Sequence, residues 1–498
     1  MIIDKKRELG QFFTPKGVAD FMATFFFDQR RTVNLLDAGA GTGILTKSFI
    51  NRLCLSQNRP EQIKVTAYEI DSILIPQLME TMSECKRICE DIGISFKAEI
   101  RRKDFVEDAV RLIRKNGATP IDLKFNAAIV NPPYKKIKSN SKSRLLLQSI
   151  GIETSNLYTA FLSLIVRLLN KNGELVAITP RSFCNGPYFK SFRSDFLNSM
   201  SLQRIHVYES RAAAFKDSEV LQENIIFHAV KEYTQPDRVI ISNSLGKPDA
   251  SVSMHEVKYT DVVASSDADQ FIHLVLNELN IKAKKLMKRL TTSLMELGLN
   301  VSTGRVVDFR AESFLRKTCH NNTVPLIYPC HFNGGYVCWP KIDSRKPNAI
   351  VDSAQTHQLL VPSGTYVLVK RFSAKEEKRR IVACIYNHKK INAPFVGFEN
   401  HLNYFHNKGN GIPLKLAKGL AVFLNSTIVD TYFRQFSGHT QVNATDLKSL
   451  KYPNKATLEK LGDLINLSGW NQDNIDNLVK MEVFDGQEKH KDSSKKTA

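Results

Sequence analysis

Short apolar runs alternate with longer amphipathic segments through the first 230 or so residues of the chain. The runs are rich in Val, Ile and Leu, which is typical of strands buried on both faces. The segments between most of them have the length and the spacing of helices, as at 44–53, 71–89 and 157–169. Strands are predicted at 33–38, 63–70, 96–101, 125–130, 174–179, 203–209 and 224–230.

This alternation predicts an α/β fold, a Rossmann-like doubly wound mixed sheet whose core strands are mostly parallel. Ligands of such sheets bind beyond the carboxyl ends of the strands. Polar residues that directly follow a predicted strand are therefore the first candidates for a functional site.

The pattern changes after about residue 245. A polar transition is followed by a stretch with helical spacing and a basic middle, 270–297. Short irregular strands, turns and aromatic residues come next, and helices close the chain, which is typical of an α+β domain. The chain is divided into a first domain (1–245), a linker with a connecting helix (246–297), a second domain (298–482) and a disordered tail (483–498).

The charge of the chain indicates a polyanionic partner. Seventy Lys and Arg face fifty Asp and Glu, a net charge of +20, and basic groups gain affinity by releasing counterions from phosphates. Charge alone does not distinguish DNA from RNA. The eight cysteines have no framework spacing, and no signal peptide or apolar run of membrane length is present, so a soluble cytoplasmic protein without a membrane partner is expected. No CxxC pair supports a metal site, and none is predicted.

A glycine-rich turn follows the first predicted strand. Asp37 opens the run Asp-Ala-Gly-Ala-Gly-Thr-Gly, in which Gly39, Gly41 and Gly43 allow a tight turn and a close approach of a ligand to the backbone. The helix that begins there favours an anionic group at its N-terminus. This pattern alone fits a dinucleotide fold equally well.

Acidic residues at the next two strand ends narrow the choice. Glu69 ends the second predicted strand, where a carboxylate can bind a ribose diol. Asp104 and Phe105 follow the third strand and offer an acceptor for an adenine amine and an apolar wall for its ring. Together these residues predict a site for an adenosine-containing cofactor.

The fourth strand ends in Asn131, Pro132, Pro133 and Tyr134. The prolines fix the backbone and hold the asparagine in an extended conformation, so its amide and the nearby carbonyls face one small volume. Two acceptors there can take both hydrogens of a planar exocyclic amine, and the tyrosine offers a face on which a ring can stack. The segment predicts chemistry on an amino group attached to a flat heterocycle.

Taken in order, these motifs resemble those of the S-adenosylmethionine-dependent DNA methyltransferases of the γ arrangement. In that arrangement the cofactor motifs come before the Asn-Pro-Pro-Tyr site, and the target-recognition region is C-terminal to both. In this chain the run Gly-Gln-Phe-Phe-Thr-Pro at 10–15 precedes the cofactor motifs. The likeness covers about residues 8–230. Segments 301–310 and 437–447 resemble adenine methyltransferases of the BsuBI/PstI group of type II restriction–modification systems.

The resemblance implies a class I methyltransferase fold, S-adenosylmethionine as cofactor, and Thr14 and Pro15 at the methionine end of that cofactor. It also implies double-stranded DNA as substrate, adenine N6 as acceptor, and a second domain that recognises the target sequence. A bacterial cytoplasmic monomer with a separately encoded restriction endonuclease is expected.

A mechanism follows from the acceptor. Hydrogen bonds from the amine to the Asn131 amide oxygen and the Pro132 carbonyl would favour a pyramidal nitrogen that attacks the methyl group in line. The base must leave the duplex, with Tyr134 stacking on it and Phe215 as a candidate second wall. The basic run after the motif is expected to contact DNA phosphates through Lys135, Lys136 and Lys138.

Other functions share parts of this pattern. The residues alone leave cytosine N4 open as the acceptor, and an RNA base methyltransferase would have the same cofactor fold. Methyltransferases of a release-factor glutamine share Asn-Pro-Pro-Tyr but lack a basic C-terminal domain of this size. A catalytically silent DNA-recognition module would not need Asn131, Tyr134, Asp37 and Glu69.

Overall fold

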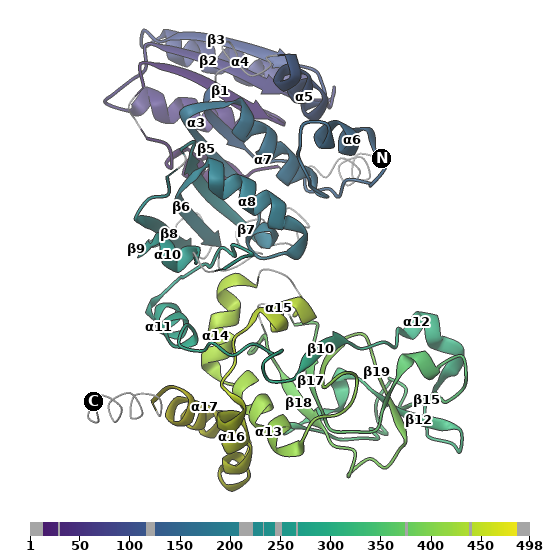
Figure 1. Ribbon diagram of the computed structural model, residues 1–498. Helices are drawn as coiled ribbons and strands as arrows, with labels where there is room; N and C mark the ends of the chain where they lie inside the picture. The colour runs from purple at the N-terminus through teal and green to yellow at the C-terminus, as the bar shows by residue number, and fades with distance from the viewer. Residues whose placement is uncertain are drawn as a thin grey trace, which may run out of the picture. The chain divides into compact units, whose positions relative to one another are not determined.

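The computed structural model of the 498-residue chain describes residues 13–27, 30–115, 125–208, 223–232, 234–244, 251–264, 267–373, 377–437 and 441–485. The chain forms two compact units, Met1–Leu276 and Asn277–Ala498 (Figure 1). Among the described residues, no helix is both long and apolar enough to cross a membrane.

The described part of the first unit is built on one nine-stranded mixed sheet with the order β3-β2-β1-β4-β5-β7-β6-β8-β9. Strands β3, β2, β1, β4 and β5 run parallel, whereas β7 is antiparallel to both of its neighbours. The strands are β1 (Thr32–Ala38), β2 (Gln62–Tyr68), β3 (Ser95–Arg101), β4 (Phe125–Val130), β5 (Leu169–Pro180), β6 (Ser201–Tyr208), β7 (Asn224–Val230), β8 (Arg238–Ser244) and β9 (Ser253–Lys258).

Helices pack against the sheet because its central strands, such as β4 and β5, bury apolar side chains on both faces. One core cluster joins side chains of β1, β2, β4 and β5 to those of α2, α3 and α4. The helices are α2 (Lys16–Ala23), α3 (Ile44–Leu55), α4 (Ile75–Glu90), α5 (Phe105–Lys115), α6 (Lys142–Gln148), α7 (Leu157–Leu168), α8 (Lys190–Ser199) and α10 (Tyr259–Val262). The doubly wound α/β prediction is confirmed, and all seven predicted strands are present with ends shifted by a few residues.

The region predicted as a linker, 246–297, has a different structure. It contains β9, which pairs with β8 and extends the sheet. A strand was not expected there because Ser253–Lys258 carries only two apolar residues, Met254 and Val257. The predicted helix 270–297 shortens to α11 (Glu278–Met287), because Ile272 instead donates its N–H to Cys184 and forms a bridge with Val263 in the first unit. The division of the chain therefore falls at 276/277.

The described part of the second unit contains a six-stranded sheet, β10-β20-β17-β18-β14-β13, and a five-stranded sheet, β11-β15-β12-β19-β16. Its helices include α13 (Leu414–Leu424), which contacts β17 (Tyr366–Lys370) and β18 (Ala383–Tyr386) and packs against α16 (Lys455–Ser468). The strands are β10 (Asn300–Thr303), β11 (Leu315–Arg316), β12 (Thr323–Ile327), β13 (Phe332–Asn333), β14 (Tyr336–Val337), β15 (Ala349–Val351), β16 (Leu360–Pro362), β17 (Tyr366–Lys370), β18 (Ala383–Tyr386), β19 (Phe395–Phe398) and β20 (Leu402–His406). The remaining helices are α12 (Asp308–Ala311), α14 (Thr427–Phe436), α15 (Ala444–Ser449), α16 (Lys455–Ser468) and α17 (Gln472–Val479).

The start of the predicted disordered tail is ordered. A π-helix spans Lys480–Asp485 and buries Val483 and Phe484, because these two apolar side chains find a place in the core of the second unit. The rest of the predicted tail, 486–498, lies outside the described residues.

Candidate active site

A cavity lies at the carboxyl ends of β1, β2, β3 and β4. These strands are parallel neighbours, so the segments that follow them meet at one edge of the sheet. The cavity brings together seven of the candidate residues from the sequence, namely Gly39, Gly41, Glu69, Asp104, Phe105, Asn131 and Pro133. It is lined by Phe13, Gly39, Gly41, Tyr68, Glu69, Ile70, Leu74, Lys103, Asp104, Phe105, Asn131, Pro133, Leu157 and Phe161.

The glycine turn after β1 forms one wall. Gly39 and Gly41 have φ angles of 90° and 57°, which residues with a side chain rarely adopt. The backbone N–H of Gly39 donates to the carbonyl of Tyr68 at 3.0 Å, and this bond ties the turn to the end of β2. Gly43 has a φ of 82° and caps the N-terminus of α3, where an added Cβ would lie 2.9 Å from Leu78 Cδ1. Gly43 therefore lets the turn pack closely against α4.

Asp37 lies behind this turn rather than on the cavity wall. Its side chain is fully buried, and its Oδ2 accepts a hydrogen bond from Thr46 Oγ1 at 2.7 Å. Its Oδ1 is buried without a hydrogen-bond partner in the parts of the chain that the structure describes. Burial, with a smaller contribution from the charge of Glu69, raises the pKa of Asp37 to about 7 against the opposing effect of the Thr46 hydrogen bond. The carboxyl joins the turn to α3, a position different from the cofactor contact expected from the sequence.

Glu69 binds the glycine turn directly. Its two carboxylate oxygens accept hydrogen bonds from the backbone N–H groups of Gly41 at 2.8 Å and Asp71 at 2.7 Å. Burial raises the pKa of this carboxyl, and the backbone donors partly oppose the shift. Since each carboxylate oxygen can accept more than one hydrogen bond, these contacts fix the side chain and leave it able to bind a ligand in the cavity.

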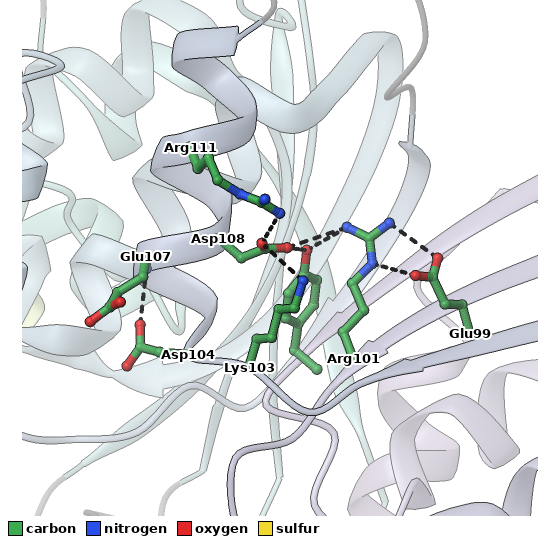
Figure 2. Close-up of polar contacts among 8 residues, drawn as sticks. Glu99, Arg101, Lys103, Asp104, Glu107, Asp108 and Arg111 are labelled. Carbon is green, nitrogen blue, oxygen red and sulfur yellow. Dashed lines mark hydrogen bonds and ion pairs between the residues drawn. The ribbon is translucent and has the colours of Figure 1, made fainter.

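Asp104 both caps a helix and lines the cavity. Its Oδ1 accepts from the backbone N–H of Glu107 at 3.0 Å, so it caps the start of α5 (Figure 2). Its neighbour Phe105 is buried and lines the cavity beside it. The helix-cap role and the ligand-facing role are therefore compatible for this carboxylate.

Aromatic rings form the floor beside these acids. The Phe105 ring lies 5.0 Å from that of Tyr68 and 4.9 Å from that of Phe161, measured between centroids. Such a wall suits a flat heterocycle. Tyr68 and Phe161 were missed by sequence reasoning, although Tyr68 directly precedes Glu69 in the chain.

A network of charged side chains around Asp108 holds the Tyr68 ring in place. Figure 2 shows Arg101, Lys103 and Arg111 around Asp108. The Tyr68 phenol donates to Asp108 Oδ2 at 2.9 Å and accepts from Arg101 Nη1 at 2.8 Å. Asp108 is buried, and Arg111 and Lys103 approach its Oδ1 to 2.5 and 3.8 Å. Lys103 also lines the cavity. It went unnoticed in the sequence because a lysine next to a turn is usually only solvated.

Asn131 forms the opposite wall, directly after β4. Its Nδ2 donates to Thr14 Oγ1 at 3.0 Å, and its Oδ1 accepts from the Tyr134 phenol at 2.9 Å. The same phenol lies 3.3 Å from the carbonyl of Ile178, and burial raises the pKa of Tyr134. The amide is thus oriented by the side chains of Thr14 and Tyr134, and Asn131 lines the cavity.

The other residues of the two proline motifs surround this amide. Pro132 is buried, and Pro133 lines the cavity. Thr14 is buried and reaches the site through Asn131, while Pro15 is exposed and caps the start of α2. Phe13 lies against Gly41, since a Cβ added there would be 3.8 Å from its ring.

The basic run after the motif is exposed beside the cavity. Lys135, Lys136 and Lys138 are all exposed. Their backbone is fixed because the Lys135 carbonyl accepts from the N–H of Leu157 at 2.8 Å, and Leu157 lines the cavity. The other predicted base-stacking residue, Phe215, lies outside the described residues.

The strand order, the antiparallel β7 and the glycine turn after β1 define a class I methyltransferase fold. The Eco57I restriction-modification methylase family matches residues 47–215. The chain is 44% identical over 474 residues to the type II methyltransferase M.PstI of Providencia stuartii, covering 95% of this chain and 92% of that protein. It is 45% identical over 486 residues to the type II methyltransferase M.BsuBI of Bacillus subtilis, covering 97% and 94%. The chain belongs to this family of type II methyltransferases.

A solved structure of similar fold is that of a nuclease-deletion mutant of the type ISP restriction-modification enzyme LlaGI. It matches with a TM-score of 0.50 and 12% identity, covering 93% of this chain and 47% of that one. The likeness concerns the fold. The similarity to M.PstI and M.BsuBI confirms the predicted family membership. The order and direction of the strands confirm the predicted fold class.

Proposed function

We propose that this protein transfers a methyl group from S-adenosylmethionine to N6 of an adenine flipped out of duplex DNA, at a specific sequence. One observation carries the proposal: Asn131, at the end of β4, lines the same cavity as the glycine turn and Glu69. The group proposed to bind the amine and the wall proposed to bind the cofactor therefore share one small volume, as a direct transfer requires.

The cavity fits the proposed cofactor by its chemistry. Tyr68, Phe105 and Phe161 offer aromatic faces for an adenine ring, and Asp104 offers an acceptor beside them. Glu69 is a fixed carboxylate at the place where a ribose diol would bind. S-adenosylmethionine would supply an electrophilic methyl group on a sulfonium, held near the glycine turn with Thr14 and Pro15 at its methionine end.

The acceptor side is proposed to activate the amine. An exocyclic amine is a poor nucleophile because its lone pair is delocalised into the ring. The Asn131 amide oxygen and the Pro132 carbonyl are proposed to accept one N–H hydrogen each, so that the lone pair points at the methyl group. Transfer would form the N–C bond as the sulfonium S–C bond breaks and S-adenosylhomocysteine leaves, and the methylated amine would then give its extra proton to solvent. This chain's residues provide position and electrostatics rather than a covalent intermediate.

Duplex DNA is the proposed substrate for two reasons. The net charge of +20 favours a polyanion, and the family comprises restriction–modification methylases. Lys135, Lys136 and Lys138 are proposed to contact phosphates beside the flipped base, and Tyr134 and Phe215 to flank it. The second unit is proposed to read the target sequence, the protein to act as a cytoplasmic monomer, and a separate endonuclease to be its counterpart.

The test is transfer of label from labelled S-adenosylmethionine to duplex DNA, with nucleoside analysis of the product. N6-methyladenine is expected, and sequencing of modified bases in DNA from expressing cells would give its context. Label in N4-methylcytosine would show that the acceptor is cytosine N4 and not adenine N6. Label only in RNA or protein would overturn the proposal. Asn131→Ala protein, purified in parallel, controls for a contaminating activity.

A further inference from the structure

An exposed tyrosine stands at the catalytic edge of the sheet. Strand β5 runs parallel to β4, and its end, Pro180, leads into two short 3-10 helices, Arg181–Cys184 and Pro187–Phe189, before α8. Tyr188, in the second of these, is 81% exposed. Its position places a large aromatic side chain in solvent one strand away from the Asn131 motif.

The turn that carries Tyr188 is held firmly. The buried Arg193 donates from Nη1 to the carbonyls of Phe183 at 3.0 Å and Gly186 at 2.8 Å. A Cβ on Gly186 would lie 2.7 Å from a ring carbon of Phe189 and 2.9 Å from the carbonyl of Ser182, so the turn is closely packed. Tyr188 is therefore presented by a fixed backbone, which lowers the entropy that a contact through it would cost.

A chain of aromatic rings links this turn to the active site. The Tyr134 ring lies 6.2 Å from that of Tyr158, and the Tyr158 ring lies 5.6 Å from that of Phe189. The Tyr158 hydroxyl also lies 2.9 Å from Ser182 Oγ. Tyr188 directly precedes Phe189, the last ring of this chain, so the turn that carries Tyr188 is packed through these rings onto the Asn131 motif.

A single exposed apolar side chain is ordinary on a protein surface. Leu55 is an example: it is 85% exposed at the C-terminal end of α3, and this helix runs away from the glycine turn. Three features set Tyr188 apart from Leu55, namely its aromatic face, its fixed turn and its place at the catalytic edge.

We propose that Tyr188 stacks on the duplex at the place from which the target adenine is withdrawn. This inference rests on the proposed function. Flipping removes a base from between its two neighbours and loses their stacking. An aromatic side chain that contacts the exposed base faces restores part of that interaction, and its hydroxyl can remain in water. Tyr188 thus stabilises the open duplex and takes no part in methyl transfer itself.

The experiment uses the full-length protein and a duplex with the target site found by sequencing modified bases. The fluorescence of 2-aminopurine at the target position reports flipping. Tyr188→Ala and Tyr188→Leu are expected to reduce the flipped fraction and to weaken DNA binding about tenfold, because stacking on a base is lost. Tyr188→Trp and Tyr188→Phe are expected to retain both, and Leu55→Ala to change neither.

A second substrate separates stacking from a general defect. A target adenine in a mismatch costs less to flip, so the defect of Tyr188→Ala should shrink to less than about threefold on that duplex. Cofactor affinity and the melting temperature should match the wild type. An equal defect on both duplexes, or wild-type behaviour of Tyr188→Ala, would overturn this inference while wild-type methylation still supports the proposed function. Absence of DNA methylation by the wild type would overturn the proposed function itself.

Discussion

The two sides of the cavity are held in different ways. On the side proposed to bind the cofactor (the cofactor side), Glu69 accepts hydrogen bonds from the backbone N–H groups of Gly41 and Asp71. Asp104 accepts one from the backbone N–H of Glu107 at the start of α5. On the side proposed to bind the acceptor amine (the acceptor side), the Asn131 amide donates to Thr14 and accepts from Tyr134. The first arrangement is fixed by the fold, and the second depends on the identity of a few side chains.

This difference teaches which functions can be separated by mutation. A change on the acceptor side leaves the backbone of β1, β2 and β3 in place, so cofactor binding should survive it. A change in the carboxylates should alter cofactor binding or stability before it alters the transfer step. Variants on the two sides therefore test whether the cavity works as two independent walls.

The largest effect is expected for Asn131→Ala. The variant loses the amide oxygen proposed to bind the amine, and turnover should fall about 100- to 1,000-fold, as for the loss of other groups aimed at a transition state. Cofactor affinity, measured by calorimetry, should stay within a few fold of the wild type. Asn140→Ala removes an exposed asparagine beyond the motif and should turn over normally. A parallel loss of cofactor affinity in Asn131→Ala would show that the walls are not independent.

The next effect concerns stability and its pH dependence at Asp37. Its folded-state pKa of about 7 lies above the ordinary value of 3.8, so the folded protein holds this proton more tightly than the unfolded chain. The contribution to the free energy of unfolding is present below about pH 4 and is lost as pH rises to about 7, by at most about 1.4 kcal/mol per pH unit.

Asp37→Asn removes this titration. The free energy of unfolding of the wild type, minus that of the variant, should fall as pH rises from about 4 to 7 and then level off. Denaturant unfolding at a series of pH values measures it. A difference that stays constant with pH would mean that Asp37 keeps an ordinary pKa in the folded protein.

Much of this site could be predicted from the sequence because its residues follow strands. Parallel strands bring their carboxyl ends to one edge, so Glu69, Asp104 and Asn131 could be placed together from order alone. The order of strands and motifs along the chain does not predict the direction in which a side chain points. Asp37 sits in the same run as the glycines, yet its carboxyl turns toward Thr46 and α3.

Contacts between distant segments were also beyond the sequence. Lys103 lines the cavity and Tyr188 is exposed in the turn that follows β5, but neither belongs to a motif with a fixed spacing. The same holds for β9, whose few apolar residues form a strand because β8 offers an edge to pair with. The local hydrophobic pattern predicts a strand well when the strand is buried on both faces. It predicts a strand poorly when the strand forms only because a neighbouring strand pairs with it.

On the cofactor side, Glu69→Gln is expected to weaken binding of S-adenosylmethionine by about tenfold or more, the usual scale for losing hydrogen bonds to a charged group. The amide replaces one acceptor by a donor, which then faces the N–H of Gly41 or Asp71. Turnover at saturating cofactor should change much less than affinity. Glu61→Gln alters an exposed glutamate that pairs with Arg31 and should leave affinity unchanged. If Glu69→Gln lowered turnover without changing affinity, Glu69 would belong to the acceptor side.

The smallest effect separates two roles of Tyr134. Tyr134→Phe keeps the ring and removes the phenol that donates to Asn131 Oδ1. The amide then loses one orienting contact worth about 1 kcal/mol, so turnover should fall only about fivefold, with flipping of 2-aminopurine and cofactor affinity unchanged. Tyr134→Ala also removes the ring and should lose flipping as well, by about 1–3 kcal/mol if the base stacks there. Equal defects in the two variants would mean that the ring adds nothing, and that Tyr134 acts on the acceptor side through Asn131 alone.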